Sequence, residues 1–469
     1  MAGKLHARDM TQGVIWKEIL MFSLPLMLGN LFQQFYNTVD CIVVGNFVGK
    51  EALAAVGATS SIINTLVGFF MGMATGAGVV ISQYFGAKDE PHLQKAVHTT
   101  VSLTLLMGVG FTALSMVLTV PLLRFMKTPA DVFGEAKTYL IIYFAGMLGL
   151  MLYNMGSGIL RAVGDSRRPL YFLILCSILN VVLDLLFVAV FRMGVAGAAY
   201  ATILAQFISA GLIWYILWRS KECYRFRPKE IALDRDITRF IFRVGLPAGL
   251  QQAVTAFSNV FVQSYINAFG SASMAGWSSY ARIDPFVLLP MQSISLACTT
   301  FVGQNVGAGQ LKRSEKGTRQ SMYLSWGLTV VLSALLYIFC RPIISVFNRD
   351  PDVVYYGTLF IRLMSPFYVL CCVNQIYAGA LRGAGDAKAP MFMMLGSFVV
   401  FRQIYLYVGT KFIHGIEFVA LGYPVGWLLC SILMYIYYRR GNWRMKCQFI
   451  TPQTVQAGET AGAAGPEEE

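Results

Sequence analysis

Two carboxylic acids interrupt stretches of sequence that are otherwise apolar, and they are the residues best suited to chemistry. Asp184 lies in SILNVVLDLLF, residues 177–187, and Asp40 ends a similar stretch that begins near Lys17. An ionised carboxylate in an apolar interior is costly, so such a residue usually faces a cavity, has a partner or takes up a proton. The two acids are therefore candidates for binding a proton or a cation.

Asn180 and Asp184 are four residues apart, so on a helix their side chains occupy one face and can share a proton, a cation or a water molecule. A second acid nearby favours the neutral form of one member of the pair, and this would make Asp40 and Asp184 a switchable site. Tyr139 and Asn154 are candidates to complete this polar cluster. The alternative for Tyr139 is an anchoring role at the membrane interface, where tyrosines are common.

The second half of the chain carries a different set of charges within apolar stretches, namely Arg282, Asp284, Arg362 and Arg402. Arg282 and Asp284 are two residues apart, so they do not face each other on a regular helix, although Pro285 can change that geometry. Two interpretations stay open for these residues. They form structural ion pairs that line or close a cavity, or they shape the electrostatics of a substrate cavity.

The composition places these residues in a membrane protein. Of 469 residues, 56% are hydrophobic and only 13% are charged, which is too few to cover a soluble globule of this size. Apolar stretches of about 20 residues, each long enough to cross a bilayer, recur between short polar loops. The sequence predicts an all-α membrane protein with twelve transmembrane helices. The expected spans are 16–44, 53–82, 96–123, 138–160, 169–191, 195–218, 240–267, 274–303, 321–340, 355–380, 390–411 and 418–438.

The distribution of basic residues predicts the orientation of these helices. With both termini in the cytosol, 26 Lys and Arg residues fall in cytosolic segments and eight in the opposite loops. The net charge of +13 therefore reflects topology, and we see no motif for nucleic acid. The expected organisation is a cytosolic segment 1–15, an N-lobe 16–219, a basic cytosolic linker 220–239, a C-lobe 240–440 and a cytosolic, disordered tail 441–469.

An internal repeat divides the chain into two similar halves. LRAVGDSRRP at residues 160–169 recurs as LRGAGDAKAP at 381–390, and SQYFGAKD around Gly86 corresponds to GQNVGAGQ around Gly307. Six helices in each half is an even number, so both halves enter the membrane in the same direction. The two lobes are therefore predicted to be related by a pseudo-twofold axis along the membrane normal, with a cleft between them.

The segment DMTQGVIWKEILMFSLPLMLGNLFQQFYNTVDCIVVGNFVG, together with the two LR–GD motifs, resembles the multidrug and toxic compound extrusion (MATE) family, in particular its bacterial DinF-like branch. The resemblance covers residues 9–440. It implies a V-shaped, two-lobe antiporter of the bacterial inner membrane that expels organic, often cationic and lipophilic compounds. The driving force would be an inward proton or sodium gradient.

The resemblance also implies roles for individual residues. The family's N-lobe cation site falls here on Asp40, on Asn180 with Asp184, and on Tyr139 and Asn154. Other members carry a carboxylate site in the C-lobe. Here Val262 stands where the repeat would copy Asp40, and no acid occurs between residues 355 and 380, so no second ion site is expected.

We therefore expect a secondary active multidrug efflux antiporter that works by alternating access, as a monomer, with drugs or metabolites, membrane lipids and H⁺ or Na⁺ as its partners. No cofactor is expected and no metal other than Na⁺, for which Asp40, Asn180 and Asp184 offer oxygen ligands. The sequence has no HExxH, GxSxG or clustered acidic motif, which argues against an enzyme. The alternative is a lipid-linked oligosaccharide flippase of the same superfamily, which the arginines Arg282 and Arg402 keep open.

Overall fold

The computed structural model describes residues 8–48, 50–126 and 128–446. Side chains are described for all of these except residues 36, 37, 40–42, 44–46, 50–54, 58, 61, 257, 260, 445 and 446. Of the predicted disordered tail 441–469, residues 447–469 lie outside the described residues, as does the side chain of Asp40, while the first part of that tail contains the short helix Trp443–Lys446. Within the described ranges the secondary structure is helical, and they contain no strand.

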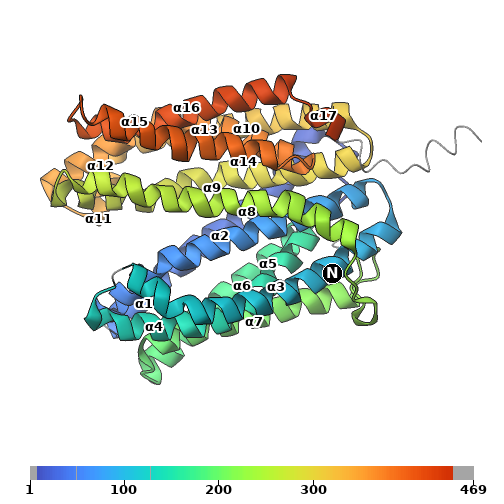
Figure 1. Ribbon diagram of the computed structural model, residues 1–469, viewed down its shortest axis with the longest axis horizontal. Coiled ribbons are helices and arrows are strands. Elements are labelled where there is room, and N and C mark those ends of the chain that lie inside the picture. The colour runs from blue at the N-terminus through green and yellow to red at the C-terminus, as the bar shows by residue number, and fades with distance from the viewer. Residues whose placement is uncertain (1–7, 49, 127, 447–469) are drawn as a thin grey trace, which may run out of the picture.

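The first half of the chain forms one group of helices, drawn in blue to green in Figure 1. Its elements are α1 (Ile15–Phe47), α2 (Lys50–Gly86), α3 (Glu90–Phe125), α4 (Ala130–Ala145), α5 (Met147–Ala162), α6 (Arg167–Asp184), the π-helical segment η1 (Leu185–Val190) and α7 (Gly194–Arg219). The linker that follows contains only a short turn of 3-10 helix, η2 (Pro228–Glu230).

The second half forms the other group, drawn in yellow-green to red. Its elements are α8 (Arg235–Asn267), α9 (Ser271–Gly307), α10 (Leu311–Ile338), α11 (Cys340–Phe347), α12 (Pro351–Met364), η3 (Ser365–Phe367), α13 (Tyr368–Gly383), α14 (Lys388–Leu395), η4 (Gly396–Phe401), α15 (Arg402–Gly409), α16 (Ile416–Arg440) and α17 (Trp443–Lys446).

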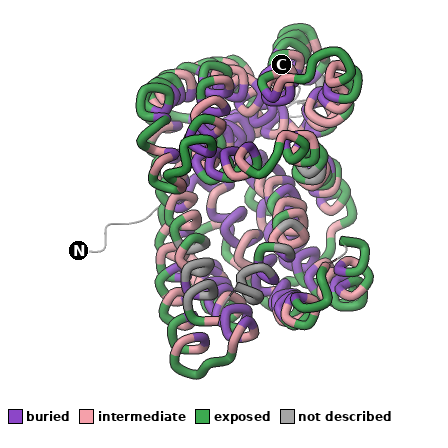
Figure 2. The backbone as a smooth tube through the Cα atoms, turned by 90° about the vertical axis from the view of Figure 1, so that its left-hand side faces the viewer, coloured by how far each residue is buried: buried purple, intermediate pink, exposed green. Residues whose placement is uncertain are grey.

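Most of these helices are suited to a bilayer by length and composition. Ten of those described are long and apolar enough to cross a membrane, and the bent pair α4 and α5 makes an eleventh. The remaining predicted span is α8, which is 33 residues long and carries Gln251, Gln252 and Asn259 along its length. Figure 2 shows exposed positions around the outside of the bundle, where many large apolar side chains such as Val117 and Ile338 are found. A bilayer would cover such a surface.

Two of the predicted spans are broken at corresponding places in the two halves. The fourth span bends by 47° at Gly146, between α4 and α5, and the tenth turns through the segment 365–367, between α12 and α13. Pro366 cannot continue an α-helix without loss of a backbone hydrogen bond, which explains the second break. Two other spans contain a π-helical segment, η1 after Asp184 and η4 before Arg402.

The repeated LR–GD motif forms the same turn in both halves. Gly164 and Gly385 have φ angles of 85° and 89°, a left-handed conformation that favours glycine. The amide of Asp165 donates to the carbonyl of Leu160 at 2.9 Å, and Asp386 donates to Leu381 at the same distance. The Asp165 carboxylate then accepts the amides of residues 167 and 168, at the start of α6. The motif is therefore a turn that reverses the chain between two helices.

The turns after α5 and α13 lie at one end of the molecule, together with the linker 220–234 and α17. This end, on the right in Figure 1, is called the linker end below, and the opposite one the far end. One buried apolar cluster lies within the N-lobe, and two others join residues of both lobes, which meet along α1 and α2 on one side and α8 and α9 on the other. The two-lobe, all-helical fold predicted from the repeat is therefore confirmed.

Candidate functional site

The predicted acid of the fifth span is fully buried in the N-lobe. Asp184 is the last residue of α6 and has an exposed fraction of 0%, and Asn180, one turn earlier, has 2%. The Asn180 Nδ2 donates to Thr202 Oγ1 of α7 at 3.4 Å. Its Oδ1 accepts no hydrogen bond within the described part of the chain, although it is buried. A buried amide oxygen therefore lies one helical turn from a buried carboxylate.

Tyr139 approaches the same region from α4. It is 4% exposed and belongs to one buried cluster with Val43 of α1 and Val188 of η1. Val43 is three residues after Asp40 and Val188 is four residues after Asp184, so each lies about one turn from its acid. The cluster thus connects the three elements on which the site was predicted. Tyr139 also stacks on Tyr143, with ring centroids 6.2 Å apart.

The two remaining residues of the predicted site are Asp40 and Asn154. The side chain of Asp40 is outside the described residues, but its helix, α1, packs along α6 and touches η1. Asn154 is on α5, only eight residues from the linker end of that helix, or roughly 12 Å. Its Nδ2 donates to the carbonyl of Leu150 in the same helix at 2.9 Å. Asn154 therefore lies closer to the linker end than Asp184, which is 17 residues into α6, or roughly 26 Å.

The C-lobe contains a partly buried acid with a different environment. Oδ1 of Asp284 on α9 accepts hydrogen bonds from the hydroxyls of Tyr280, at 2.8 Å, and Tyr368, and the two hydroxyls are 3.0 Å apart. Arg282, two residues away, is exposed. The nearest partners of the acid are hydroxyl donors and not a guanidinium, so this cluster differs from an ion pair.

Arg402 is the buried cation of the C-lobe, with an exposed fraction of 3%. Its Nη2 donates to Ser258 Oγ at 3.0 Å and to Asn259 Oδ1 at 2.9 Å, both on α8. Its guanidinium lies 4.5 Å from the ring centroid of Tyr423, which provides a cation–π contact. Arg362, by contrast, is exposed and lies 5.9 Å from the ring of Tyr337. Asp184 is thus a fully buried acid of the N-lobe, and Arg402 is a buried base of the C-lobe.

The two lobes are sealed against each other at the linker end by a symmetric pair of glutamines. Gln83 of α2 donates to the carbonyl of Gly383 in the C-lobe at 2.8 Å. Gln304 of α9 donates to the carbonyl of Ala162 in the N-lobe at 2.9 Å. Ala162 and Gly383 are 221 residues apart, and so are the two glutamines, which matches the spacing of the LR–GD repeat. Each lobe therefore binds the other through the same contact.

Glycines allow the backbones to meet beside these hydrogen bonds. A Cβ atom on Gly86 would lie 1.9 Å from the carbonyl oxygen of Gln304, and one on Gly307 would lie 1.9 Å from that of Gln83. The cavity next to this seal, lined by α2, α5 and α9, has a volume of only about 20 Å³. A drug-sized molecule needs at least about 300 Å³. The linker end is therefore closed between the lobes at this point.

The N-terminal segment adds a second layer to this seal. The amide of Arg8 donates to the carbonyl of Val163 in the N-lobe at 3.1 Å, while the amide of Met10 donates to Gln304 Oε1 at 2.9 Å. Arg313 of α10 donates through Nη2 to the carbonyls of Gln12 and Gly13, at 2.7 and 2.9 Å. Residues 8–13 thus connect both lobes across the closed end.

The sealing role of these residues was not predicted from the sequence. A signal was nevertheless present, because SQYFGAKD and GQNVGAGQ keep a glutamine and a glycine at the same positions of the repeat. Preservation of both residues in both halves indicates a contact across the pseudo-twofold axis. The N-terminal segment gives no such signal, since it has no copy in the second half.

Comparison with known proteins places this geometry in context. The family model MatE matches the chain twice, over residues 25–186 and 247–408. The chain is 32% identical to the probable multidrug resistance protein YpnP of Bacillus subtilis, over 94% of this chain and 98% of that protein. It is 24% identical to a FAD transporter of Shewanella oneidensis, over 90% and 94%.

The fold is also similar to solved structures. One is described as the outward-facing conformation of a multidrug resistance MATE family transporter of the MOP superfamily. It superposes with a TM-score of 0.87 at 25% identity, over 95% of this chain and 98% of the other. Each matched segment of the family model lies within one of the two lobes, in agreement with the internal repeat.

Proposed function

Because this chain belongs to the MatE family of multidrug efflux transporters, we propose that it is a secondary active antiporter that exports lipophilic organic cations in exchange for an inward-moving proton or sodium ion. As a member of this family it is a multi-pass membrane transporter and not an enzyme. The proposed location is the bacterial inner membrane, with the linker end in the cytosol as the basic residues predict, and the proposed functional unit is a monomer.

The proposal rests on Oδ1 of Asn180, which is buried without a hydrogen bond from any described residue and lies one helical turn before the buried residue Asp184. Amide and carboxylate oxygens on one helical face are both acceptors, so they repel unless something positive lies between them. A proton on Asp184 would turn its carboxyl group into a donor toward Asn180. A sodium ion would instead use both oxygens as ligands. Either ion would lower the cost of burying the acid.

The energy available from one ion is sufficient for efflux. A proton that moves inward down about 100 mV gains about 2.3 kcal/mol, and each unit of pH difference adds about 1.4 kcal/mol. Together these support a concentration ratio of roughly several hundredfold for one exported compound. Coupling requires that the ion and the compound prefer different conformations. A transporter that is closed at the linker end would be in the state in which it has released the compound on the side opposite the cytosol.

The test is transport in proteoliposomes with one gradient imposed at a time. We expect ethidium accumulation driven by a pH gradient or by a sodium gradient in the native protein, and loss of gradient-driven accumulation in Asp184→Asn. Asp131→Asn is the matched control, since it removes an exposed acid from α4 of the same lobe. Native accumulation in Asp184→Asn would overturn the proposed role of this acid. Flavin adenine dinucleotide belongs among the compounds tested, given the transporter of that name among the relatives.

A further inference from the structure

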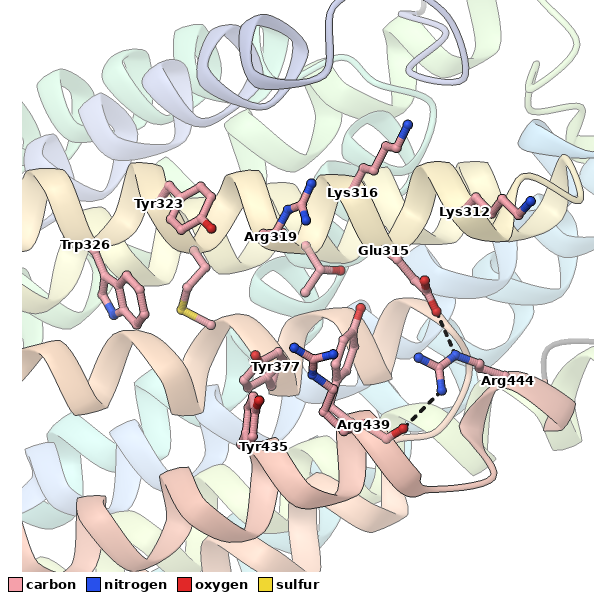
Figure 3. A pocket seen from close by; sticks show the side chains of 13 residues that line it. Lys312, Glu315, Lys316, Arg319, Tyr323, Trp326, Tyr377, Tyr435, Arg439 and Arg444 are labelled. Atoms are coloured by element: carbon pink, nitrogen blue, oxygen red, sulfur yellow. Dashed lines mark hydrogen bonds and ion pairs between the residues drawn. The ribbon is translucent and has the colours of Figure 1, made fainter.

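A groove on the outer surface of the C-lobe has the properties of a ligand site, away from the predicted transport pathway. It lies between α10, α13 and α16 at the linker end and has a volume of about 690 Å³ (Figure 3). Its lining is basic at one end, where Lys312, Lys316 and Arg319 project from α10. These three positions are four and three residues apart, so they lie on one face of the helix.

The charge of the groove is not balanced within the described part of the chain. Five basic side chains and one carboxylate line it, which gives a formal charge of +4. The carboxylate, Glu315, is already paired with Arg444, whose Nε lies 2.6 Å from its Oε1. No described acid forms an ion pair with Lys312, Lys316 or Arg319. The groove therefore favours an anionic ligand.

The other end of the groove is aromatic and leads onto an apolar surface. The ring of Tyr377 packs at a tilt of 31° against that of Tyr438, with centroids 4.6 Å apart, and the Trp326 indole donates a hydrogen bond to the carbonyl of Val369 at 3.2 Å. Farther along, Val330 of α10 and Ile432 of α16 are about half exposed. Lys312 and Trp326 are 14 residues apart, or roughly 21 Å along the helix. From the linker end inward, the groove is thus first charged, then aromatic and then apolar, and this order follows the expected membrane normal.

We propose that this groove binds the headgroup of an anionic phospholipid. The phosphodiester would lie among the lysines and arginines, and the acyl chains would run past the aromatic rings and along α10 and α16. Basic pockets between transmembrane helices suit such headgroups, and aromatic side chains suit the interface below them. The chain's own acidic C-terminus is the competing occupant. Its sequence QTVQAGETAGAAGPEEE offers few apolar side chains for the aromatic end, which favours the lipid.

Native mass spectrometry and thermal unfolding of the purified full chain test this proposal. We expect phosphatidylglycerol or cardiolipin to remain bound and to raise Tm, and phosphatidylcholine to do neither. Inorganic phosphate and glycerol phosphate should raise Tm far less than the intact lipid, since they lack acyl chains. The double variant Lys316→Gln with Arg319→Gln should bind anionic lipid about tenfold more weakly or worse. Its Tm in phosphatidylcholine should equal that of the native protein, which separates lipid binding from folding.

The matched control is Lys229→Gln with Arg235→Gln, which removes two basic residues from the linker end outside the groove. It should leave lipid binding unchanged. Equal weakening by both double variants would overturn the proposal, because the lipid would then respond only to total charge. The proposal would also be overturned if anionic lipid bound only after deletion of residues 447–469, because the tail would then be the occupant of the groove in the full chain.

Discussion

Substitution of Gly86 by alanine is expected to open the seal at the linker end. The added Cβ would lie 1.9 Å from the carbonyl oxygen of Gln304, whereas ordinary contacts begin at 3.4 Å, so the ends of α2 and α9 would have to part by about 1.5 Å. The three nearest atoms that the Cβ would meet are all backbone atoms of Gln304, so the clash cannot be relieved by a side-chain rotation. A movement of this size is enough to break the hydrogen bond from Gln83 to Gly383, which is 2.8 Å long.

The magnitude follows from two terms. Forcing an extra carbon into a packed contact costs about 1–3 kcal/mol, and each hydrogen bond that is lost costs about 1 kcal/mol net. Together these disfavour the closed state by about 2–4 kcal/mol, which corresponds to a population shift of roughly 30- to 700-fold. The open state forms neither contact, so the substitution penalises the closed state alone.

Hydrogen exchange measured by mass spectrometry is a direct assay for this shift. We expect faster amide exchange in segments 80–90 and 300–310 of Gly86→Ala, with native exchange in α7, which would show that neither lobe has unfolded. Gly327→Ala is the matched control, because a Cβ at that position meets nothing within 4 Å. Native exchange in both sealing segments of Gly86→Ala would refute the reasoning, and so would an equal effect of Gly327→Ala.

The remaining predictions concern the turn at Asp165 and the partly buried acid Asp284. Asp165→Ala should destabilise the protein by about 1 kcal/mol, because the carboxylate caps α6 and pairs with Arg168 at 3.2 Å. Thermal unfolding checks this, and Asp165→Asn should recover most of the loss, since asparagine also caps helices. Tyr368→Phe removes one of the two hydroxyls that donate to Asp284 and should cost about 1.5–3 kcal/mol, which is typical for a hydrogen bond to a charged group. An unchanged Tm in Tyr368→Phe would mean that Asp284 does not depend on this donor.

Much of the architecture was accessible from the sequence because it is repeated. The repeated LR–GD motif predicted the division into two lobes. The apolar stretches of about 20 residues predicted helices throughout. The breaks in the fourth and tenth spans were not predicted, because hydropathy averages over a bend at Gly146. The segment 365–367 contains Pro366, a visible signal for a break, yet it lies within a continuous apolar stretch.

The site was predictable in part for physical reasons. An acid within an apolar run is expensive, so Asp184 could be singled out, and its spacing from Asn180 fixed their common face. Burial of Tyr139 with residues near both acids could not be derived from spacing, since it depends on how α4 packs against α1 and η1. The contact of Asp284 with Tyr368 was equally inaccessible, because Tyr368 is 84 residues away in the sequence, whereas Tyr280 precedes Asp284 by one helical turn, a spacing that the sequence shows.

If an ion at Asp184 and the transported compound prefer different conformations, binding of the compound should release the ion, and this release is the most direct test of the proposed coupling. A lipophilic cation is added to purified protein in unbuffered detergent solution, with a pH indicator for protons and a radioactive tracer for bound sodium. We expect the native protein to release one of these ions, and Asp184→Asn to bind the compound without releasing either. Release of neither ion by the native protein, or equal release by Asp184→Asn, would contradict the account.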